Sequence, residues 1–590
     1  MLETRPRQVV EDTSPVDFRD RTTGDTCFIL QTPDSPGSSS RTYPLQPPRL
    51  NRPVSNTPQA AQIVPHSTSP KVTHADRSRL LFSLGRVDKL FPNPNLPSSN
   101  ALTRYIAGYF TGFYAHVPFT HIPTFKLESC SAELCLAIMA LGAVDRFEFK
   151  AATELFFLSK ALLLDSQQRR VRSETSRTTD LSRNPTSVRK QLMDELRCLL
   201  CLAYFTSWQS DVTIRSETCI LVGLLDQALK LSGLEETLHT AESDHWEQWS
   251  QLESERRTKL FAFSFLNVQS ITYNMPPSIW CEEINLKLPC SCPEWTAPDE
   301  TSWDMLRRAT IPNEQGLFND ALNILLSGTK QLNPNIATVS PVGNYILIHA
   351  LLHKIMWTRR SISGNVSRAV SDDPFMYRSA LHQWTLSWQQ TPESNLEPLD
   401  PNGPLPFTSS ALLSLAYVRN CFDVFQTRKL QTWSPTEIAQ ALQSSFSVDR
   451  KRNTLLAAYH ATNLLSTLVK LGVQYFKHNQ AVLWSIEAAL CGLDCSIFLE
   501  KWLRRVQKSM CDVPLTEHEV QLVTWIQDVV YEGLSSANEG SFSKAAALAM
   551  IPDQIVTVWS HIMQGNSPYP FIEMIGDVLV EYKQIASAPR

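Results

Sequence analysis

Glycine is scarce in this chain, at 19 of 590 residues, about half of its usual share of roughly 7%. Loops that hold phosphates or catalytic nucleophiles need glycine where the backbone takes a positive φ. The sequence contains no G-x-G-x-x-G, no G-x-x-x-x-G-K-[ST] and no G-x-S-x-G. These absences weigh against the common dinucleotide-binding, phosphate-loop and serine-hydrolase classes.

Secretory signals and long apolar runs are lacking as well. The charged start at 1–7 is followed by no apolar segment, so we expect no signal peptide. The richest apolar stretches, 134–144 and 481–499, are short or interrupted by Glu487 and Asp494, whereas a membrane-spanning helix needs about 20 apolar residues. We therefore expect a protein inside the cell, without membrane contact, whose 13 cysteines stay reduced.

Positive charge is not clustered. The net charge of −4 divides into +3 for residues 1–100 and −7 for the rest of the chain. Proteins that neutralise many phosphates concentrate lysine and arginine in a basic domain. The bulk of this chain is therefore not expected to bind DNA strongly by itself.

The composition divides the chain into an arm and a helical body. Residues 1–97 hold 14 of the 37 prolines together with serine and threonine runs, and too few apolar residues to offset the entropy of ordering. We expect a disordered arm, with one short helix at 79–91 that either docks on the body or binds a partner. From residue 98 apolar residues recur at helical spacing and strand alternation is almost absent, which predicts an all-α fold, a large irregular multi-helix bundle.

The body is expected to contain a first helical region at 98–388, a proline-rich linker at 389–408, and a C-terminal helical region at 409–590 packed on the first. The predicted helices are 132–144, 148–165, 189–209, 213–232, 253–273, 409–430, 435–445, 451–473, 482–507, 516–535 and 565–583. A polar stretch at 166–190 has no core pattern, so we expect a solvated loop insertion. Its Arg169, Arg170 and Arg172 are candidates for nuclear import.

Cysteines and histidines with metal-ligand spacing lack the rest of a metal site. Cys198 and Cys201 have C-x-x-C spacing but lie in an apolar helix without a second pair, and structural zinc needs four ligands. His349 and His353 share one helix face as in zinc proteases, yet Ala350 stands where such a protease has glutamate. We expect core roles for these residues, and no metal or cofactor.

Catalytic groups are not evident either. Asp372 and Asp373 resemble the metal-binding carboxylate pair of helical isoprenoid cyclases, but no third carboxylate follows. Since no nucleophile, base or metal cluster can be named, we expect a protein that is not an enzyme. A helical metal-dependent enzyme built on these two aspartates is a remote alternative.

One long constellation is specific. Tryptophan pairs, a charged helix segment and proline pairs recur in a fixed order, carried by Trp246, Trp249, Glu255, Arg256, Arg257, Asn274, Pro276, Pro277, Leu288, Pro289, Cys290, Trp295 and Trp303. The order resembles the middle homology region of fungal transcription factors. Further matches extend the resemblance over about 98–505, and the downstream ones are similar to the subgroup with tandem two-cysteine two-histidine fingers.

The same residues have a physical interpretation. The segment from Glu253 to Arg257 begins a helix whose phenylalanines face inward, so its charges are expected to pair at the solvent end or with other helices. The tryptophans are expected to be packing anchors and the proline pairs to end helices. A ligand or co-regulator contact is the alternative for each of them.

The resemblance implies a nuclear regulator of RNA polymerase II genes, with 98–388 as its regulatory domain and co-regulators or a second copy as partners. Such a regulator can belong to a metabolic or biosynthetic pathway. In the family a zinc module binds DNA, but residues 1–100 contain one cysteine, Cys27, and two histidines, His66 and His74. Neither a six-cysteine cluster nor paired fingers can be built from these. We therefore expect zinc only if a finger module lies upstream. The alternative is a finger-less protein that dimerises or competes with DNA-binding regulators.

Overall fold

A computed structural model of the chain describes residues 28–29, 44–45, 70–92, 94–175, 185–236, 245–309, 316–327, 339–363, 374–397, 400–421, 428–445, 447–483, 485–536 and 548–587. The chain divides into two compact units, residues 1–49 and 50–590. In the first unit the strands β1 (Phe28–Ile29) and β2 (Pro44–Leu45) pair antiparallel, with Phe28 opposite Leu45.

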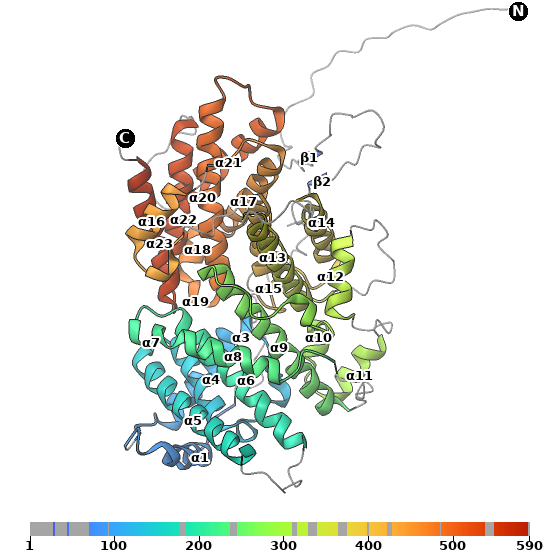
Figure 1. Ribbon diagram of the computed structural model, residues 1–590, viewed down its shortest axis with the longest axis vertical. Helices are drawn as coiled ribbons and strands as arrows, with labels where there is room; N and C mark the ends of the chain where they lie inside the picture. Colours follow the sequence, from blue (N-terminus) through green and yellow to red (C-terminus); the bar gives the residue numbers. More distant parts are fainter. Residues whose placement is uncertain are drawn as a thin grey trace, which may run out of the picture. The chain divides into compact units, whose positions relative to one another are not determined.

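The described part of the second unit is built of helices (Figure 1). Its first half contains α1 (His74–Leu84), η1 (Gly85–Val87), α2 (Ser99–Thr111), α3 (Phe113–His116), η2 (Ile122–Thr124), η3 (Leu127–Ser129), α4 (Ala132–Val144), α5 (Phe149–Thr175), α6 (Pro185–Ser207), α7 (Val212–Ser216), α8 (Thr218–Leu231) and α9 (Trp246–Tyr273). Then follow η4 (Cys281–Glu283), α10 (Cys292–Trp295), α11 (Glu300–Ala309), α12 (Phe318–Ser327), α13 (Pro341–Ser363) and α14 (Pro374–Gln390).

The second half contains α15 (Leu405–Cys421), η6 (Leu430–Thr432), α16 (Pro435–Ser444), α17 (Arg452–Leu471), α18 (Val473–His478), α19 (Gln480–Leu483), α20 (Ile486–Ser509), α21 (Glu517–Ser536), η7 (Leu548–Met550), α22 (Ile551–Met563) and α23 (Pro570–Ser587). The predicted all-α fold is confirmed for the described residues of the second unit. The predicted arm lies, up to residue 69, almost entirely outside them.

Helix α4 lies at the centre of the first half. The Ser131 side chain caps it by accepting from the Leu134 amide, and every residue of the helix is buried, as expected for a helix that is apolar on all sides. A Cβ at Gly142 would lie 1.7 Å from the Tyr105 carbonyl oxygen. Glycine therefore lets α2 cross α4 at backbone contact, and α5 and α6 pack on α4 as well.

The second half is built around α20, which packs against α15, α17, α22 and α23. Trp502 on α20 and Trp559 on α22 are fully buried. The two halves touch through side chains: the Tyr345 hydroxyl donates to Glu487 Oε1 at 3.2 Å, and the Trp208 and Phe571 rings lie 5.0 Å apart. All of these helices lie in one compact unit.

The arm ends earlier than predicted. Residues 70–97 belong to the second unit, because Leu80 and Leu84 of α1 are fully buried and Arg79 donates to the Leu127 and Cys130 carbonyls. The short helix predicted at 79–91 is found as α1 and η1, and it docks on the body.

The prediction of a loop at 166–190 is wrong for the residues of this stretch that the structure describes. Helix α5 continues to Thr175 and α6 begins at Pro185. Polar pairs hold these extensions: Arg170 pairs with Glu195 across the two helices at 3.1 Å, and Gln167 donates to Glu195 at 2.8 Å. Apolar periodicity does not reveal a helix end that is stabilised by such polar contacts.

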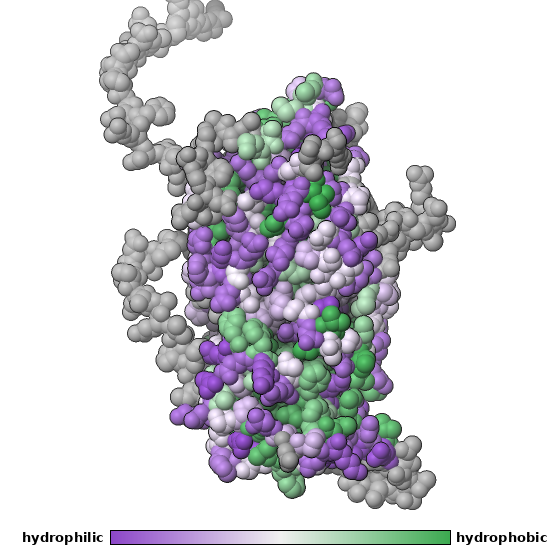
Figure 2. All heavy atoms as spheres, turned by 90° about the vertical axis from the view of Figure 1, so that its left-hand side faces the viewer, coloured by the Kyte–Doolittle hydropathy of each residue, from purple (hydrophilic) through white to green (hydrophobic). Residues whose placement is uncertain are grey.

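The surface is mixed in character. Figure 2 shows one face on which polar residues dominate the upper part, and hydrophobic residues become more frequent lower down. In Figure 1 the lower part of that side holds α5 and α7. These helices carry the exposed side chains of Phe149, Val171 and Val212.

Candidate functional site

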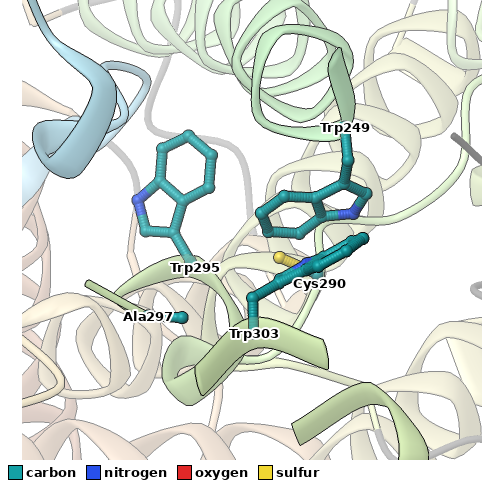
Figure 3. Close-up of a cluster of buried hydrophobic side chains, with 5 residues drawn as sticks. All are labelled: Trp249, Cys290, Trp295, Ala297 and Trp303. Carbon is teal, nitrogen blue, oxygen red and sulfur yellow. The ribbon is translucent and has the colours of Figure 1, made fainter. Parts of the chain in front are cut away.

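Three tryptophans of the specific constellation meet in one buried cluster (Figure 3). Trp249 comes from α9, Trp295 from α10 and Trp303 from α11, and Cys290 and Ala297 complete the cluster. The Trp249 and Trp303 rings lie 5.2 Å apart. Trp246 packs on the edge of the cluster and stays partly exposed. The tryptophans thus join three helices that follow one another along the chain.

His121 packs against the tryptophans of the cluster. Its ring is 4.8 Å from that of Trp295, and its Nδ1 is 2.8 Å from Thr124 Oγ1. Burial and, second to it, the positive charge of Arg257 lower the pKa of His121 to about 4. At neutral pH this histidine is therefore an uncharged packing partner of the tryptophan.

Glu253 holds the charged part of the constellation together inside the protein. Its side chain is fully buried; it accepts from Arg257 Nε at 2.8 Å and from the Cys290 amide at 2.9 Å, and it pairs with Arg256. Arg256 also pairs with Glu236. We expected these charges to pair at a solvent end of the helix or with other helices. Glu253 instead pairs within α9 and in the core, whereas Glu255 pairs with Arg189 of another helix, α6.

The electrostatics of this network favour the charged carboxylate. Burial by itself would raise the pKa of Glu253, but Arg256 and Arg257 lower it to about 2. Burial by itself would lower the pKa of each arginine, but Glu253 raises the pKa of Arg256, and Cys290 and Glu253 raise the pKa of Arg257. Arg257 also donates to the Cys290 carbonyl at 3.2 Å and lies 4.1 Å over the Trp295 ring. The charge network and the tryptophan cluster therefore form one continuous site.

The remaining residues of the constellation surround this site. Glu255 points away from it and pairs with Arg189 at 2.6 Å. Asn274 ends α9 in the left-handed conformation, with φ 55°, which asparagine tolerates better than most residues. The other members differ in exposure: Pro276 is exposed, Pro277 is half-buried, and Leu288 and Pro289 are buried. The Pro289 carbonyl accepts from Ser340 at 2.7 Å.

The histidines and cysteines with metal-like spacing lie in the core. His349 contacts Asn267 Nδ2 at 3.2 Å, and His353 Nδ1 lies 3.5 Å from Cys281 Sγ. Burial lowers the pKa of His349 to about 3, and Cys198 and Cys201 are fully buried. Among the residues that the structure describes, no three His, Cys, Asp or Glu side chains are placed to hold a metal ion.

Other predicted positions are placed as follows. Arg169 and Arg172 are exposed on α5, and Arg169 pairs with Asp165 at 2.7 Å. Asp372 and Asp373 lie outside the described residues. Within the described helices none is long and apolar enough to cross a membrane.

A second buried charge network was not predicted from the sequence. Asp494 on α20 is fully buried between Arg419 of α15 and Arg428, with 3.0 Å between Arg428 Nη1 and Asp494 Oδ1. Arg428 also donates to the carbonyls of Ile271 and Thr272 at the end of α9. The partners lie 66 and 75 residues from Asp494, so no local sequence signal links them. The one hint was a lone aspartate in an apolar helix.

Comparisons with known proteins agree on the class of domain. Residues 106–397 match the family model described as the fungal specific transcription factor domain, and residues 423–581 match that of the fungal transcription factor C-terminal domain. A curated relative, zinc finger protein C11D3.17 of Schizosaccharomyces pombe (strain 972 / ATCC 24843), is 24% identical over 275 residues. That alignment covers 44% of this chain and 41% of the relative, so the chain matches less than half of its length. No solved structure matches the chain.

Proposed function

The chain belongs to the family of proteins with a fungal specific transcription factor domain, and we propose that it regulates RNA polymerase II transcription in the nucleus. The resemblance read from the tryptophan and proline constellation is thereby confirmed. The observation that carries the proposal is the pair of family matches, at 106–397 and 423–581, which cover most of the described residues. Both family descriptions name transcription factors, and neither names an enzyme. A role in a metabolic or biosynthetic pathway remains part of this proposal.

We propose that the helical body acts through protein partners such as co-regulators or a second copy. Residues 101–590 carry a net charge of −7, and a surface of that sign repels phosphates. Contact with DNA would then come from a zinc-containing module upstream or on a partner. The curated relative is named as a zinc finger protein, which supports an association of this kind of body with such modules.

We propose a structural role for the constellation itself. Trp249, Trp295 and Trp303 are each at most 8% exposed, and Glu253 and Arg257 are satisfied by each other and by the Cys290 backbone. Such a filled site leaves little room for a ligand. Loss of regulation in variants of these residues should therefore go together with loss of folded protein.

A tethering experiment tests the main proposal. The full 590-residue chain is fused to a DNA-binding domain of known specificity and expressed with a reporter gene that carries its site. We expect reporter transcript to change several-fold relative to the DNA-binding domain alone, because the body brings co-regulators to the promoter. An unchanged reporter, with the fusion folded and present in the nucleus, would contradict the proposal.

The basic stretch on α5 is proposed to serve nuclear import. Arg169 and Arg172 are exposed, whereas Arg170 pairs with Glu195. Replacing all three arginines by alanine in a fluorescently tagged chain should reduce the nuclear signal. The control replaces only the strongly exposed Arg308 of α11 by alanine. An unaltered nuclear signal in the α5 variant would rule out this import signal.

A second candidate is a finger-less protein that works through DNA-bound regulators. Residues 1–100 contain one cysteine and two histidines, too few to build either zinc module of the family, so this candidate assigns the DNA contact to a partner. A gel-shift assay with a zinc determination on the purified 590-residue chain tests it. This candidate predicts no bound zinc and no shift of free DNA, but a supershift of a regulator already on DNA. Zinc together with direct DNA binding would count against it.

A further inference from the structure

Two cysteines meet at the beginning of helix α4. Ser131 caps this helix, so Cys130 is the residue before the cap and Cys135 is the fourth residue of the helix. Apolar side chains at these two positions often pack against each other across a helix start. Cys135 Sγ lies 4.0 Å from the Cys130 carbonyl oxygen and 3.6 Å from that of Leu127. Cys135 is fully buried and Cys130 is partly exposed.

The docked helix α1 covers this pair. Arg79 donates from Nη1 to the Cys130 carbonyl at 3.0 Å and from Nη2 to the Leu127 carbonyl at 2.8 Å. The same Nη2 lies 3.7 Å from Cys135 Sγ. The Arg79 guanidinium therefore contacts both the turn before α4 and the Cys135 sulfur. A chemical change at the two sulfurs would alter these contacts of α1.

The two thiols have different surroundings: Cys130 Sγ lies 3.6 Å from the Lys126 carbonyl oxygen, whereas Cys135 Sγ faces the Leu127 and Cys130 carbonyls and Arg79. A hydrogen bond from Cys135 lowers the pKa of Cys130, and Arg197 on α6 lowers it too, against burial and the negative charge of Asp194. The same hydrogen bond and burial raise the pKa of Cys135. A cysteine whose thiolate is stabilised beside a protonated partner thiol is the arrangement of a reactive and a resolving cysteine.

We propose that Cys130 and Cys135 form a modification site for hydroperoxides, in which oxidation joins the two sulfurs beneath α1. The Cys130 thiolate attacks one oxygen of hydrogen peroxide and the O–O bond breaks, which leaves a sulfenic acid and a hydroxide that takes up a proton. The Cys135 sulfur then attacks the Cys130 sulfur, and the sulfenic oxygen leaves as water with the Cys135 proton. Two thiols become one disulfide, and one peroxide becomes two water molecules.

The disulfide changes the contacts of α1. A disulfide has no S–H donor and carries no negative charge, so closing it removes the contacts of the Cys135 thiol with the Leu127 and Cys130 carbonyls, to which Arg79 also donates. Oxidation therefore weakens the docking of α1. The inference is independent of the proposed role in transcription, since it concerns the purified chain.

The test begins with the reactivity of the thiols in the full-length chain. At neutral pH we expect iodoacetamide to modify Cys130 on the order of tenfold faster than Cys219, an exposed cysteine on α8 that serves as the internal control. After treatment with hydrogen peroxide, peptide mass analysis without reductant should find the peptide pair 130 and 135 lighter by two hydrogen atoms. A Cys135→Ala variant should instead accumulate a sulfenic acid at Cys130 that reacts with dimedone, and Cys130→Ser should give neither product.

The docking of α1 is measured on the same samples by hydrogen exchange. We expect the α1 amides to exchange faster in the oxidised protein, and reductant to restore the slower rate. In Cys130→Ser, peroxide should leave the exchange of these amides unchanged. Labelling of Cys130 no faster than that of Cys219, or peroxide treatment without a 130–135 disulfide in the wild-type chain, would overturn the proposal. Unchanged α1 exchange in fully oxidised protein would overturn the link to docking.

Discussion

Two carboxylates of this protein lie fully buried between pairs of arginines, but the two sites are built in different ways. Glu253 receives both arginines from its own helix, three and four residues further along. Asp494 receives Arg419 and Arg428 from segments 75 and 66 residues away. The first site can form as α9 forms, because its charges are neighbours on one helix face. The second exists only after α20 has met the segment that carries both Arg419 and Arg428.

The two sites also stabilise different parts of the molecule. The Glu253 site connects α9 to the turn at Cys290 and to Trp295, all within the matched region 106–397. The Asp494 site joins the two matched regions, since Arg428 binds carbonyl oxygens at the C-terminal end of α9. The C-terminal end of a helix carries a partial negative charge, which favours the Arg428 cation at this position. The Glu253 motif, which the sequence shows, thus stabilises region 106–397. The Asp494 network, which the sequence does not show, stabilises the junction between the two matched regions.

The largest effect is expected from Asp494→Asn. Replacing the carboxylate leaves Arg419 and Arg428, exposed by 1% and 2%, buried without the negative charge they share. The loss of a buried partner of this kind costs about 3–5 kcal/mol. Urea unfolding followed by circular dichroism should show this loss, with Asp512→Asn at an exposed position as the matched control. A loss below about 1 kcal/mol would show that the network does not secure the junction.

Glu253→Gln should cost less, about 2–3 kcal/mol. Glutamine keeps an oxygen that can accept from the Cys290 amide, and Arg256 keeps its pair with Glu236. The same urea titration measures the difference between the two variants. If Glu253→Gln lowered the free energy of unfolding more than Asp494→Asn does, the Glu253 site would contribute more to the stability of the helical body than the Asp494 network.

The same carboxylate predicts a dependence on pH. The pKa of Glu253 is about 2 in the folded protein, below its ordinary value of 4.5. A lowered pKa means that its contribution to stability is complete above about pH 5 and is lost as the pH falls from 4.5 toward 2. The free energy of unfolding should therefore fall less steeply over this range in Glu253→Gln than in wild type. Parallel pH profiles would contradict the charged state of Glu253.

Asp145 offers a carboxylate with an opposite shift. It accepts from the Phe113 amide at 3.0 Å, and burial raises its pKa to about 7. A raised pKa means that its favourable contribution is present below about pH 4 and is lost as the pH rises to 7. Asp145→Asn should remove this slope and stabilise the protein at pH 8 by about 1–2 kcal/mol. A variant less stable than wild type at pH 8 would contradict the burial argument.

The smallest effect is expected from Glu255→Gln. Glu255 belongs to the same motif as Arg256 and Arg257, but it pairs with a half-exposed Arg189. Surface ion pairs contribute about 0–1 kcal/mol, so thermal unfolding should shift only slightly. A loss as large as that of Glu253→Gln would show that membership of the motif, and not burial, decides the energetic effect.

Sequence reasoning succeeded where local signals coincide. The bounds of α4 were predicted as 132–144 and are found there, because a capping serine precedes a segment that is apolar on all sides. It failed where distant contacts decide. The polar ends of α5 and α6 are helical since Arg170 and Gln167 meet Glu195 across them, and Glu253 is in the core since the segments around Cys290 cover it.

The site was predicted to a similar extent. The order of tryptophans and prolines identified the family, and the cluster of Trp249, Trp295 and Trp303 agrees with their expected packing. The Asp494 network could not be foreseen, because arginines and aspartates are common and spacing alone does not pair residues 66 positions apart. Pairing of that kind depends on the folded arrangement of three segments.

Whether this helical body regulates transcription can be measured in the cell by acute depletion of the protein. The chain is tagged at its own locus for rapid degradation, and nascent transcripts are measured before indirect effects accumulate. We expect a defined set of RNA polymerase II transcripts to change within this time and to recover when wild-type chain is supplied, but not when the Asp494→Asn variant is supplied. Nascent transcripts that stay unchanged after complete depletion would contradict it.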